Sequence, residues 1–254
     1  MNDTKKPVKT LELEVATDAT PEQVWKAITE AAQVQNWFAP DVTSAGSGKG
    51  STLTVSWGGG MEFTTMIGAW EPNRHVQWLH EDMFGPGTNL VADWHISTQA
   101  GKTKLRLVQS GFGDFEGWDD FFAGTEVGWR YFLHNMRVYV EKHRGKHRLM
   151  ISSRFPVGIG RAQAWKKLPV AKAGEKVSLD LGEHVDAIVD LVIPERALAL
   201  RIPAWDHALL FYEFEGSGEE FHTGAWLSVY DPRTASRIEA GAKQAFDRLA
   251  AALK

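Results

Sequence analysis

The sequence contains no cysteine, which excludes disulfide bonds and thiolate metal ligands. It also lacks any apolar run approaching the roughly 20 residues that a membrane-spanning helix needs. Its formal net charge of −4 at pH 7 provides no general attraction to nucleic acid or to anionic membranes. The N-terminal MNDTKKPVKT carries basic residues without an apolar stretch behind them, so no secretory signal is expected. These absences predict a cytoplasmic protein that binds neither nucleic acid nor membranes.

Several catalytic signatures are missing as well. There is no glycine-rich phosphate loop, no zinc-protease helix motif and no Gly-x-Ser-x-Gly nucleophile turn. None of the nine histidines pairs with another at metal-ligand spacing inside one predicted element. His143 and His147 are four residues apart, but Gly145 lies between them in a predicted linker. The sequence therefore predicts no metal and no cofactor.

Aromatic residues, in contrast, are abundant. The chain has 11 tryptophans and 13 phenylalanines, and most tryptophans fall on predicted strands or helices, where packing in a core is their ordinary role. Residues 111–129, GFGDFEGWDDFFAGTEVGW, combine four phenylalanines and two tryptophans with five glycines. Glycine at this density disfavours regular structure. This segment is therefore predicted to be an apolar loop that leads into a helix.

The pattern of apolar residues predicts an α+β fold. Leu11–Thr17 alternates apolar and polar residues, as a half-buried strand does. Thr20 and Gln23 form a capping box at the start of a helix. Further strand-like segments with turn-like connections cover residues 51–57, 61–70, 75–81, 89–98 and 103–110. A long helix with one apolar face follows at about residues 125–143, and it can bury that face only against the sheet.

The rest of the chain reads as a shorter second copy of the first part. The matching segments, in the same order, are residues 11–17 with 149–155, 23–28 with 163–168, 50–55 with 174–179 and 72–76 with 194–198. A second long amphipathic helix ends the chain. The second copy has no equivalent of residues 36–48 or 111–129. Basic residues 143–148 are predicted to link two domains, residues 1–145 and 146–254.

Three segments of the first domain carry a family resemblance. TPEQVWKAITEAAQVQNWF, WEPNRHVQW and EVGWRYFLHNMRVYVEKH resemble the START-like (SRPBCC) helix-grip superfamily, and within it the homologues of the activator of the ninety-kilodalton heat-shock-protein ATPase. The resemblance covers residues 8–144 and extends to the second domain only through the internal repeat. It implies an antiparallel sheet curved around a long C-terminal helix in each copy. Because members include lipid carriers, polyketide cyclases and co-chaperones, it implies no single function.

Strand alternation identifies residues for a cavity between this sheet and the long helix of the first domain. Inward-facing strand positions and the apolar face of the helix would supply Trp57, Trp78, His80, Trp94, Gln109, Trp129, Phe132 and Met136. Such a lining, aromatic with a few polar groups, suits a small apolar or aromatic ligand. The alternative is that these side chains simply fill the core. His80 is the best acid/base candidate, although no carboxylate partner is evident in the sequence.

The loop at residues 111–129 would lie at the mouth of that cavity in a helix-grip fold. One interpretation is a mobile lid, in which glycines permit movement and aromatic side chains cover the ligand. The lid residues would be Phe112, Phe115, Trp118, Phe121 and Phe122. The other interpretation is a rigid loop packed on its own domain or on the second copy.

Three functions remain open from the sequence. The favoured one is binding of a small hydrophobic molecule in the cavity of the first domain, with the second domain serving structure or homodimerisation. The second is a co-chaperone-like or stress-related interaction domain with a chaperone as partner. The third is a cyclase- or hydrolase-type enzyme, which is less favoured because no catalytic constellation is visible.

Overall fold

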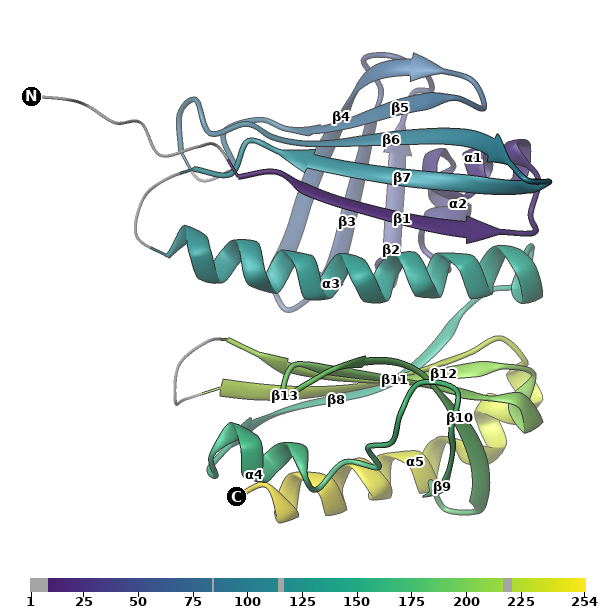
Figure 1. The fold of residues 1–254 in the computed structure, drawn as a ribbon, viewed down its shortest axis with the longest axis vertical. Coiled ribbons are helices and arrows are strands. Elements are labelled where there is room, and N and C mark those ends of the chain that lie inside the picture. The colour runs from purple at the N-terminus through teal and green to yellow at the C-terminus, as the bar shows by residue number, and fades with distance from the viewer. Residues whose placement is uncertain (1–8, 84, 114–116, 217–220) are drawn as a thin grey trace, which may run out of the picture. The chain divides into compact units, whose positions relative to one another are not determined.

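The computed structural model describes residues 9–83, 85–113, 117–216 and 221–254 (Figure 1). The chain divides into two compact units, Met1–Gly145 and Lys146–Lys254, referred to below as the first and second domain. Each unit contains one antiparallel sheet and one long helix. The prediction of an α+β fold with two tandem copies is confirmed.

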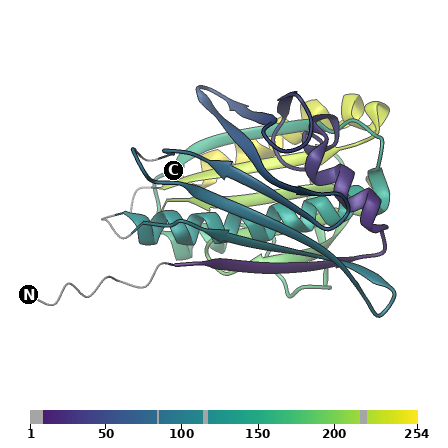
Figure 2. The ribbon, with the colours of Figure 1, turned by 90° about the horizontal axis from the view of Figure 1, so that it is seen from above.

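The first domain is a seven-stranded antiparallel sheet in the order β1-β7-β6-β5-β4-β3-β2. Its strands are β1 (Leu11–Thr17), β2 (Asp41–Ala45), β3 (Thr52–Gly58), β4 (Met61–Glu71), β5 (His75–His80), β6 (Leu90–Gln99) and β7 (Lys102–Ser110). Its helices are α1 (Pro21–Thr29), α2 (Ala31–Val34), α3 (Trp118–Val138) and the π-helical turn η1 (Tyr139–His143). Helix α3 lies along one face of the sheet, as Figures 1 and 2 show from two directions.

Helix α1 begins as the sequence predicts. The Thr20 hydroxyl accepts a hydrogen bond from the Gln23 backbone at 3.3 Å, and the Gln23 side chain accepts one from the Thr20 backbone at 2.9 Å. These reciprocal bonds satisfy two N–H groups that the first helical turn leaves unpaired. Val24 and Ile28 then occupy one face of the helix and are fully buried.

Helix α3 begins earlier than predicted. The sequence placed its start near Thr125, whereas the helix starts at Trp118, after Gly117 in a left-handed conformation. Two effects outweigh the glycine content of this segment. Asp119 and Asp120 lie in the first turn, where carboxylates favour the positive end of the helix dipole. Trp118 is also almost completely buried, so packing adds to the helix stability.

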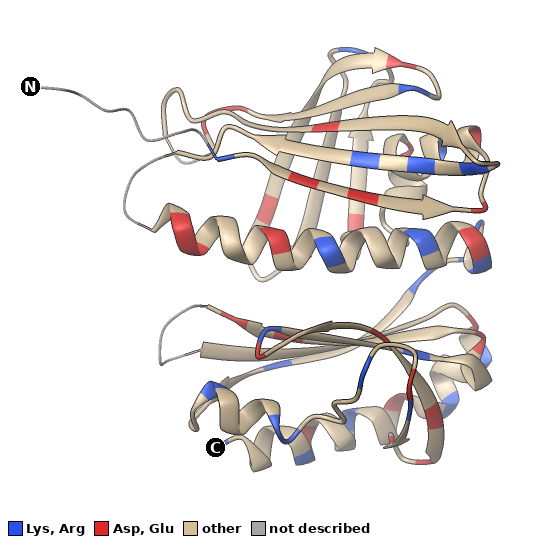
Figure 3. Ribbon diagram, in the orientation of Figure 1, with Lys and Arg blue, Asp and Glu red and all other residues tan. Residues whose placement is uncertain are grey.

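The face of the sheet opposite α3 carries charge. Along β1 and β7, acidic and basic side chains face each other across the strands, as the red and blue positions in Figure 3 show. The ion pairs are Glu12 with Arg106 at 2.7 Å and Glu14 with Lys104 at 2.6 Å. Exposed pairs of this kind contribute only about 0–1 kcal/mol each. Their role is to keep this face of the sheet polar.

The second domain repeats the arrangement with six strands, in the order β8-β13-β12-β11-β10-β9. Its strands are β8 (Leu149–Val157), β9 (Lys176–Asp180), β10 (His184–Ile193), β11 (Ala197–Ile202), β12 (Ala208–Glu215) and β13 (Phe221–Val229). Its helices are α4 (Arg161–Trp165), the 3-10 turn η2 (Pro203–Trp205) and α5 (Pro232–Ala252). Helix α5 buries Ile238, Ala242 and Phe246, one turn apart along the helix, in the domain core.

The two domains share irregular features as well as strand order. Asn73 and Glu195, in the matching turns, both have a positive φ, 62° and 58°, which is uncommon outside glycine. Two backbone hydrogen bonds also recur. Gly50 N donates to Ile67 O at 2.8 Å in the first domain, as Gly174 N does to Val189 O at 2.7 Å in the second. Likewise, Ile96 N donates to Arg74 O at 2.7 Å, as Phe214 N does to Arg196 O at 2.7 Å. Among the described strands, β2 is the one with no counterpart in the second sheet.

Candidate functional site: an aromatic cluster in the first domain

Large aromatic rings occupy the space between the first sheet and α3. Trp78 and Trp94 come from neighbouring strands and their ring centroids are 5.0 Å apart. Trp129 of α3 packs edge-on against Trp94, with centroids 5.2 Å apart, and stacks on Phe38 at 5.3 Å. The aromatic cluster consists of Trp37, Phe38, Trp57, Trp78, Trp94, Trp129 and Phe132. These rings fill much of the space that the sequence suggested as a cavity.

The structure brings most of the predicted lining residues together. Trp78, Trp94 and Trp129 form the buried centre of the cluster, whereas Trp57 and Phe132 lie at a partly exposed end. The remaining predicted residues, Met136 and Gln109, are also buried, on α3 and β7. Trp37 and Phe38 were not predicted as lining residues. They reach the cluster from the segment after α2, which helical spacing alone could not place against β6.

Two buried donors in the cluster lack a partner. The indole Nε1 atoms of Trp78 and Trp94 are shielded from solvent and have no hydrogen-bond acceptor among the residues that the structure describes. Trp129 differs, because its Nε1 donates to the Gln109 side-chain oxygen. A buried donor without an acceptor costs about 1–3 kcal/mol. The centre of the cluster therefore offers two unused N–H groups inside an otherwise apolar environment.

His80 lies at the partly exposed end of the cluster. The Thr65 hydroxyl is 2.7 Å from its Nε2 and 2.9 Å from its Nδ1, and the Phe63 ring packs edge-on at 5.4 Å. Burial lowers the pKa of His80 to about 4, and a hydrogen bond to the Thr64 backbone opposes this effect only in part. At neutral pH the ring is uncharged, so it can position a polar ligand group but is not the imidazolium that would act as a general acid.

One face of α3 leaves space beside the partly exposed end of the aromatic cluster. Gly124, Gly128 and Phe132 follow one another at intervals of four residues and so lie on one face of the helix. A Cβ atom at Gly124 would meet no atom within 4 Å, and one at Gly128 would meet only the Phe132 ring at 3.7 Å. Glycine inside a helix costs about 1 kcal/mol relative to alanine. Since close packing does not require these glycines, they are best explained by the open space that they leave.

The segment suggested as a lid is packed where it is described. Phe112 and Trp118 are both buried, with ring centroids 6.1 Å apart, and Phe122 packs on Phe112 at 4.9 Å. Gly113 lies so close to the Trp118 indole that a Cβ would be 2.3 Å from Nε1. Phe121 and Phe122 keep partial exposure. Phe115, the remaining lid residue, lies outside the described residues.

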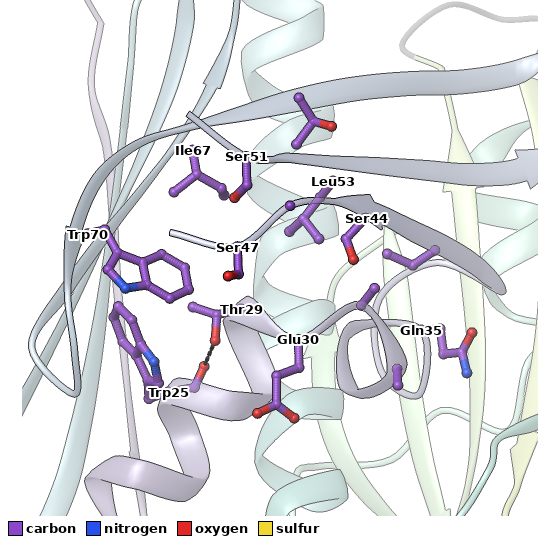
Figure 4. Close-up of a pocket in the computed structure, with 15 residues that line it drawn as sticks. Trp25, Thr29, Glu30, Gln35, Ser44, Ser47, Ser51, Leu53, Ile67 and Trp70 are labelled. Carbon is purple, nitrogen blue, oxygen red and sulfur yellow. Dashed lines mark hydrogen bonds between the residues drawn. The ribbon is translucent and has the colours of Figure 1, made fainter. Parts of the chain in front are cut away.

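A separate groove, which the sequence did not suggest, lies between α1–α2 and strands β2–β4 (Figure 4). It has a volume of about 620 Å³ and is lined by residues of five elements and the loop after β2. At one end Trp25 and Trp70 pack edge-on, with ring centroids 4.8 Å apart. Serine and threonine hydroxyls line much of the rest, and Glu30 carries the one charge among the lining residues. The lining of this groove is more polar than the aromatic cluster.

A family model matches most of the first domain. The model described as "Activator of Hsp90 ATPase homolog 1-like protein" matches residues 18–141, from the end of β1 to the π-helical turn after α3. Over these residues the first domain is similar to this family. The family match spans α1, strands β2–β7 and α3, which include the elements that surround the aromatic cluster. No curated protein matches the chain.

Solved structures match the chain at low sequence identity. The Aha1 dimer from Colwellia psychrerythraea is 22% identical, covering 54% of this chain and 99% of its own, with a TM-score of 0.48. DynU16, a putative protein in the dynemicin biosynthetic locus, is 20% identical over 96% of this chain and 98% of its own, with a TM-score of 0.46. The di-domain ARO/CYC BexL from the BE-7585A biosynthetic pathway is 13% identical over 96% and 94%, with a TM-score of 0.47.

The sequence predicts no helix that spans a membrane. None of the helices in the described part of the chain combines the length and the apolar character that crossing a bilayer requires.

Proposed function

We propose that the first domain binds a small, largely aromatic molecule that carries a hydrogen-bond acceptor, within the aromatic cluster between the sheet and α3. The observation that carries this proposal is the pair of buried indole donors, Trp78 Nε1 and Trp94 Nε1, which lack acceptors among the described residues. A carbonyl or hydroxyl oxygen beside either indole would satisfy that donor. The surrounding rings would stack on the apolar body of the ligand.

The ligand would enter at the partly exposed end of the cluster. Trp57, Phe63 and Phe132 keep partial exposure there, and the glycine-lined flank of α3 leaves space beside them. Neutral His80, held by the Thr65 hydroxyl, would provide one polar contact at this opening. The partly exposed rings of Phe121 and Phe122 would cover the ligand from the start of α3. Rotation of a few aromatic side chains would admit a ligand of one or two rings.

The test compares two probes of one skeleton, 1-tetralone with its carbonyl oxygen and tetralin without it. Quenching of tryptophan fluorescence should show 1-tetralone binding at least about tenfold more tightly, because an unpaired buried donor favours a ligand that satisfies it. Trp78→Phe and Trp94→Phe keep an aromatic ring and remove the N–H. Each should reduce this preference for 1-tetralone and leave tetralin binding nearly unchanged.

Trp70→Phe is the matched control, because Trp70 lines the separate groove and not the cluster. It should leave both affinities unchanged. The proposal is wrong if neither Trp78→Phe nor Trp94→Phe alters the preference. Weakening by Trp70→Phe alone would instead place the binding site in the groove.

The family description favours one further candidate, an interaction with a heat-shock-protein chaperone. That role would use exposed side chains and would need neither buried indole donor. A 1-tetralone preference that depends on Trp78 and Trp94 therefore supports ligand binding over a purely surface-based role. A homodimer is compatible with both functions. An acid/base enzyme has less support, because a pKa of about 4 makes His80 a weak base and its hydrogen-bond partner is a hydroxyl group.

A further inference from the structure

Two histidines and one aspartate meet on the face of the first sheet opposite α3. His75 on β5 pairs across the strands with His95 on β6, and their imidazole rings are stacked with centroids 4.5 Å apart. The Asp93 carboxylate lies 2.8 Å from His75 Nε2. One ligand atom from each of the three residues lies within 4.8 Å of the others. The geometry points to a binding site for a zinc-like divalent transition-metal ion at His75, Asp93 and His95.

The chemistry of the donors selects the class of metal. Imidazole nitrogen favours zinc, copper and nickel, whereas magnesium and calcium prefer all-oxygen sites. Donor atoms around a tetrahedral zinc ion lie about 3.3 Å apart. Because the two imidazole rings are parallel, at least one of them would have to rotate out of the stack for both to ligate the same ion. A fourth position remains for water, while the Glu71 carboxylate lies 3.9 Å from the other ring nitrogen of His75, Nδ1.

A second layer of contacts orients the aspartate. The Gln77 side chain donates to Asp93 Oδ1 at 3.1 Å, so the carboxylate is held from two sides. Gly68 on β4 makes room for this glutamine, because a Cβ there would lie 2.3 Å from the Gln77 side-chain oxygen. Outer-shell hydrogen bonds of this kind orient metal ligands and strengthen binding. His75 and Asp93 are about four-fifths buried, which limits their motion further.

The charges around the cluster are compatible with a cation. Arg106 faces His95 from β7, but its guanidinium forms a two-bond ion pair with Glu12, at 2.7 and 2.8 Å, that offsets its charge. Asp93 and Glu71 supply the negative charge nearest to the two imidazoles.

The test is calorimetric titration of zinc chloride into the full chain at pH 7.5. One equivalent should bind, and His75→Gln or His95→Gln should each weaken binding at least about tenfold, because each removes one of three ligands. His147→Gln is the matched control, since His147 is an exposed histidine outside the sheet. It should bind zinc as the unaltered chain does. Magnesium chloride should give no binding heat.

Copper provides an independent measurement at the same residues. The electron paramagnetic resonance spectrum of the Cu²⁺-loaded chain should show coupling to two imidazole nitrogens, and either variant should reduce this to one. Because His75 and His95 lie on different strands, misfolding of one variant, detected by circular dichroism, leaves the other as a test. Zinc binding that neither variant weakens would overturn the proposal, and so would the absence of stoichiometric binding.

Discussion

The two domains have the same strand order but fill their cores differently. The shared turns align Trp78 with Leu200 and Trp94 with Tyr212, and they align His80 with Ile202. The second domain thus packs mainly aliphatic side chains where the first packs tryptophans and a histidine. Since Leu200, Tyr212 and Ile202 support the same strand order, the fold does not require tryptophan or histidine at these three positions. This difference makes the cluster the best candidate for function in the first domain.

The outer faces of the two sheets also carry different residues at aligned positions. His75 and Asp93 align with Ala197 and Phe211, and His95 aligns with Glu213. The second sheet therefore lacks the three-residue donor set at the equivalent place. Substitutions that exchange residues between aligned positions test whether these differences serve function or stability. Eight of the 11 tryptophans lie in the first domain, so fluorescence reports mainly on that domain.

The largest effect is expected at Trp94, which is completely buried. Trp94→Ala should lower the free energy of unfolding of the first domain by about 3–5 kcal/mol, because it removes a large side chain and leaves a cavity. Trp94→Tyr, which introduces the residue of the second domain, should cost clearly less. Urea denaturation followed by fluorescence and circular dichroism measures both. Equal losses for the two variants would show that the indole shape itself is required.

The next effect is the pH dependence caused by His80. Its pKa is about 4 in the folded protein against 6.5 for an unperturbed histidine, so the unfolded chain binds a proton at a higher pH than the folded one. Stability is complete above pH 6.5 and falls as the pH drops toward 4, by at most about 3 kcal/mol. His80→Ile, which copies Ile202, should flatten the unfolding free energy over this window.

His147→Gln controls for histidine loss in general, because His147 is exposed. It should preserve the full pH dependence between 6.5 and 4. A His80→Ile variant with an unchanged pH profile would mean that burial of this imidazole does not govern acid stability.

The smallest effect concerns the first helix of each domain. Thr20→Ala removes the capping box of α1 and should lower stability by about 1 kcal/mol. Helix α4 has no side-chain cap at Gly160, and a Cβ there would meet no atom within 4 Å. Gly160→Ser should therefore raise the stability of the second domain by a few tenths of a kcal/mol. Thermal unfolding of both variants measures the contrast, and a destabilising Gly160→Ser would contradict it.

Local features of the fold were predictable from the sequence. The capping box at Thr20 and Gln23 and the period-2 pattern of the strands depend on residues close together in the chain. The repeat was visible because matching turns keep similar residues in both copies. The start of α3 was predicted wrongly, since burial of Trp118 outweighs the glycines around it.

The sites depend on contacts that no local pattern contains. Histidine spacing within single elements gave no metal site, because His75 and His95 become neighbours only through the pairing of β5 with β6. Alternation identified Trp78 and Trp94 as inward-facing, but it could not show that their indole N–H groups lack acceptors. Hydrogen-bond satisfaction is a property of the packed core and is set by distant residues.

The sequence by itself determined the α+β class, the tandem repeat and the faces of most strands, because side-chain periodicity and turn chemistry act over a few residues. The tertiary structure alone decided which aromatic rings meet, which polar groups stay unpaired and where a histidine pair faces an aspartate. These outcomes depend on strand register and on helix docking, which bring together residues far apart in the chain.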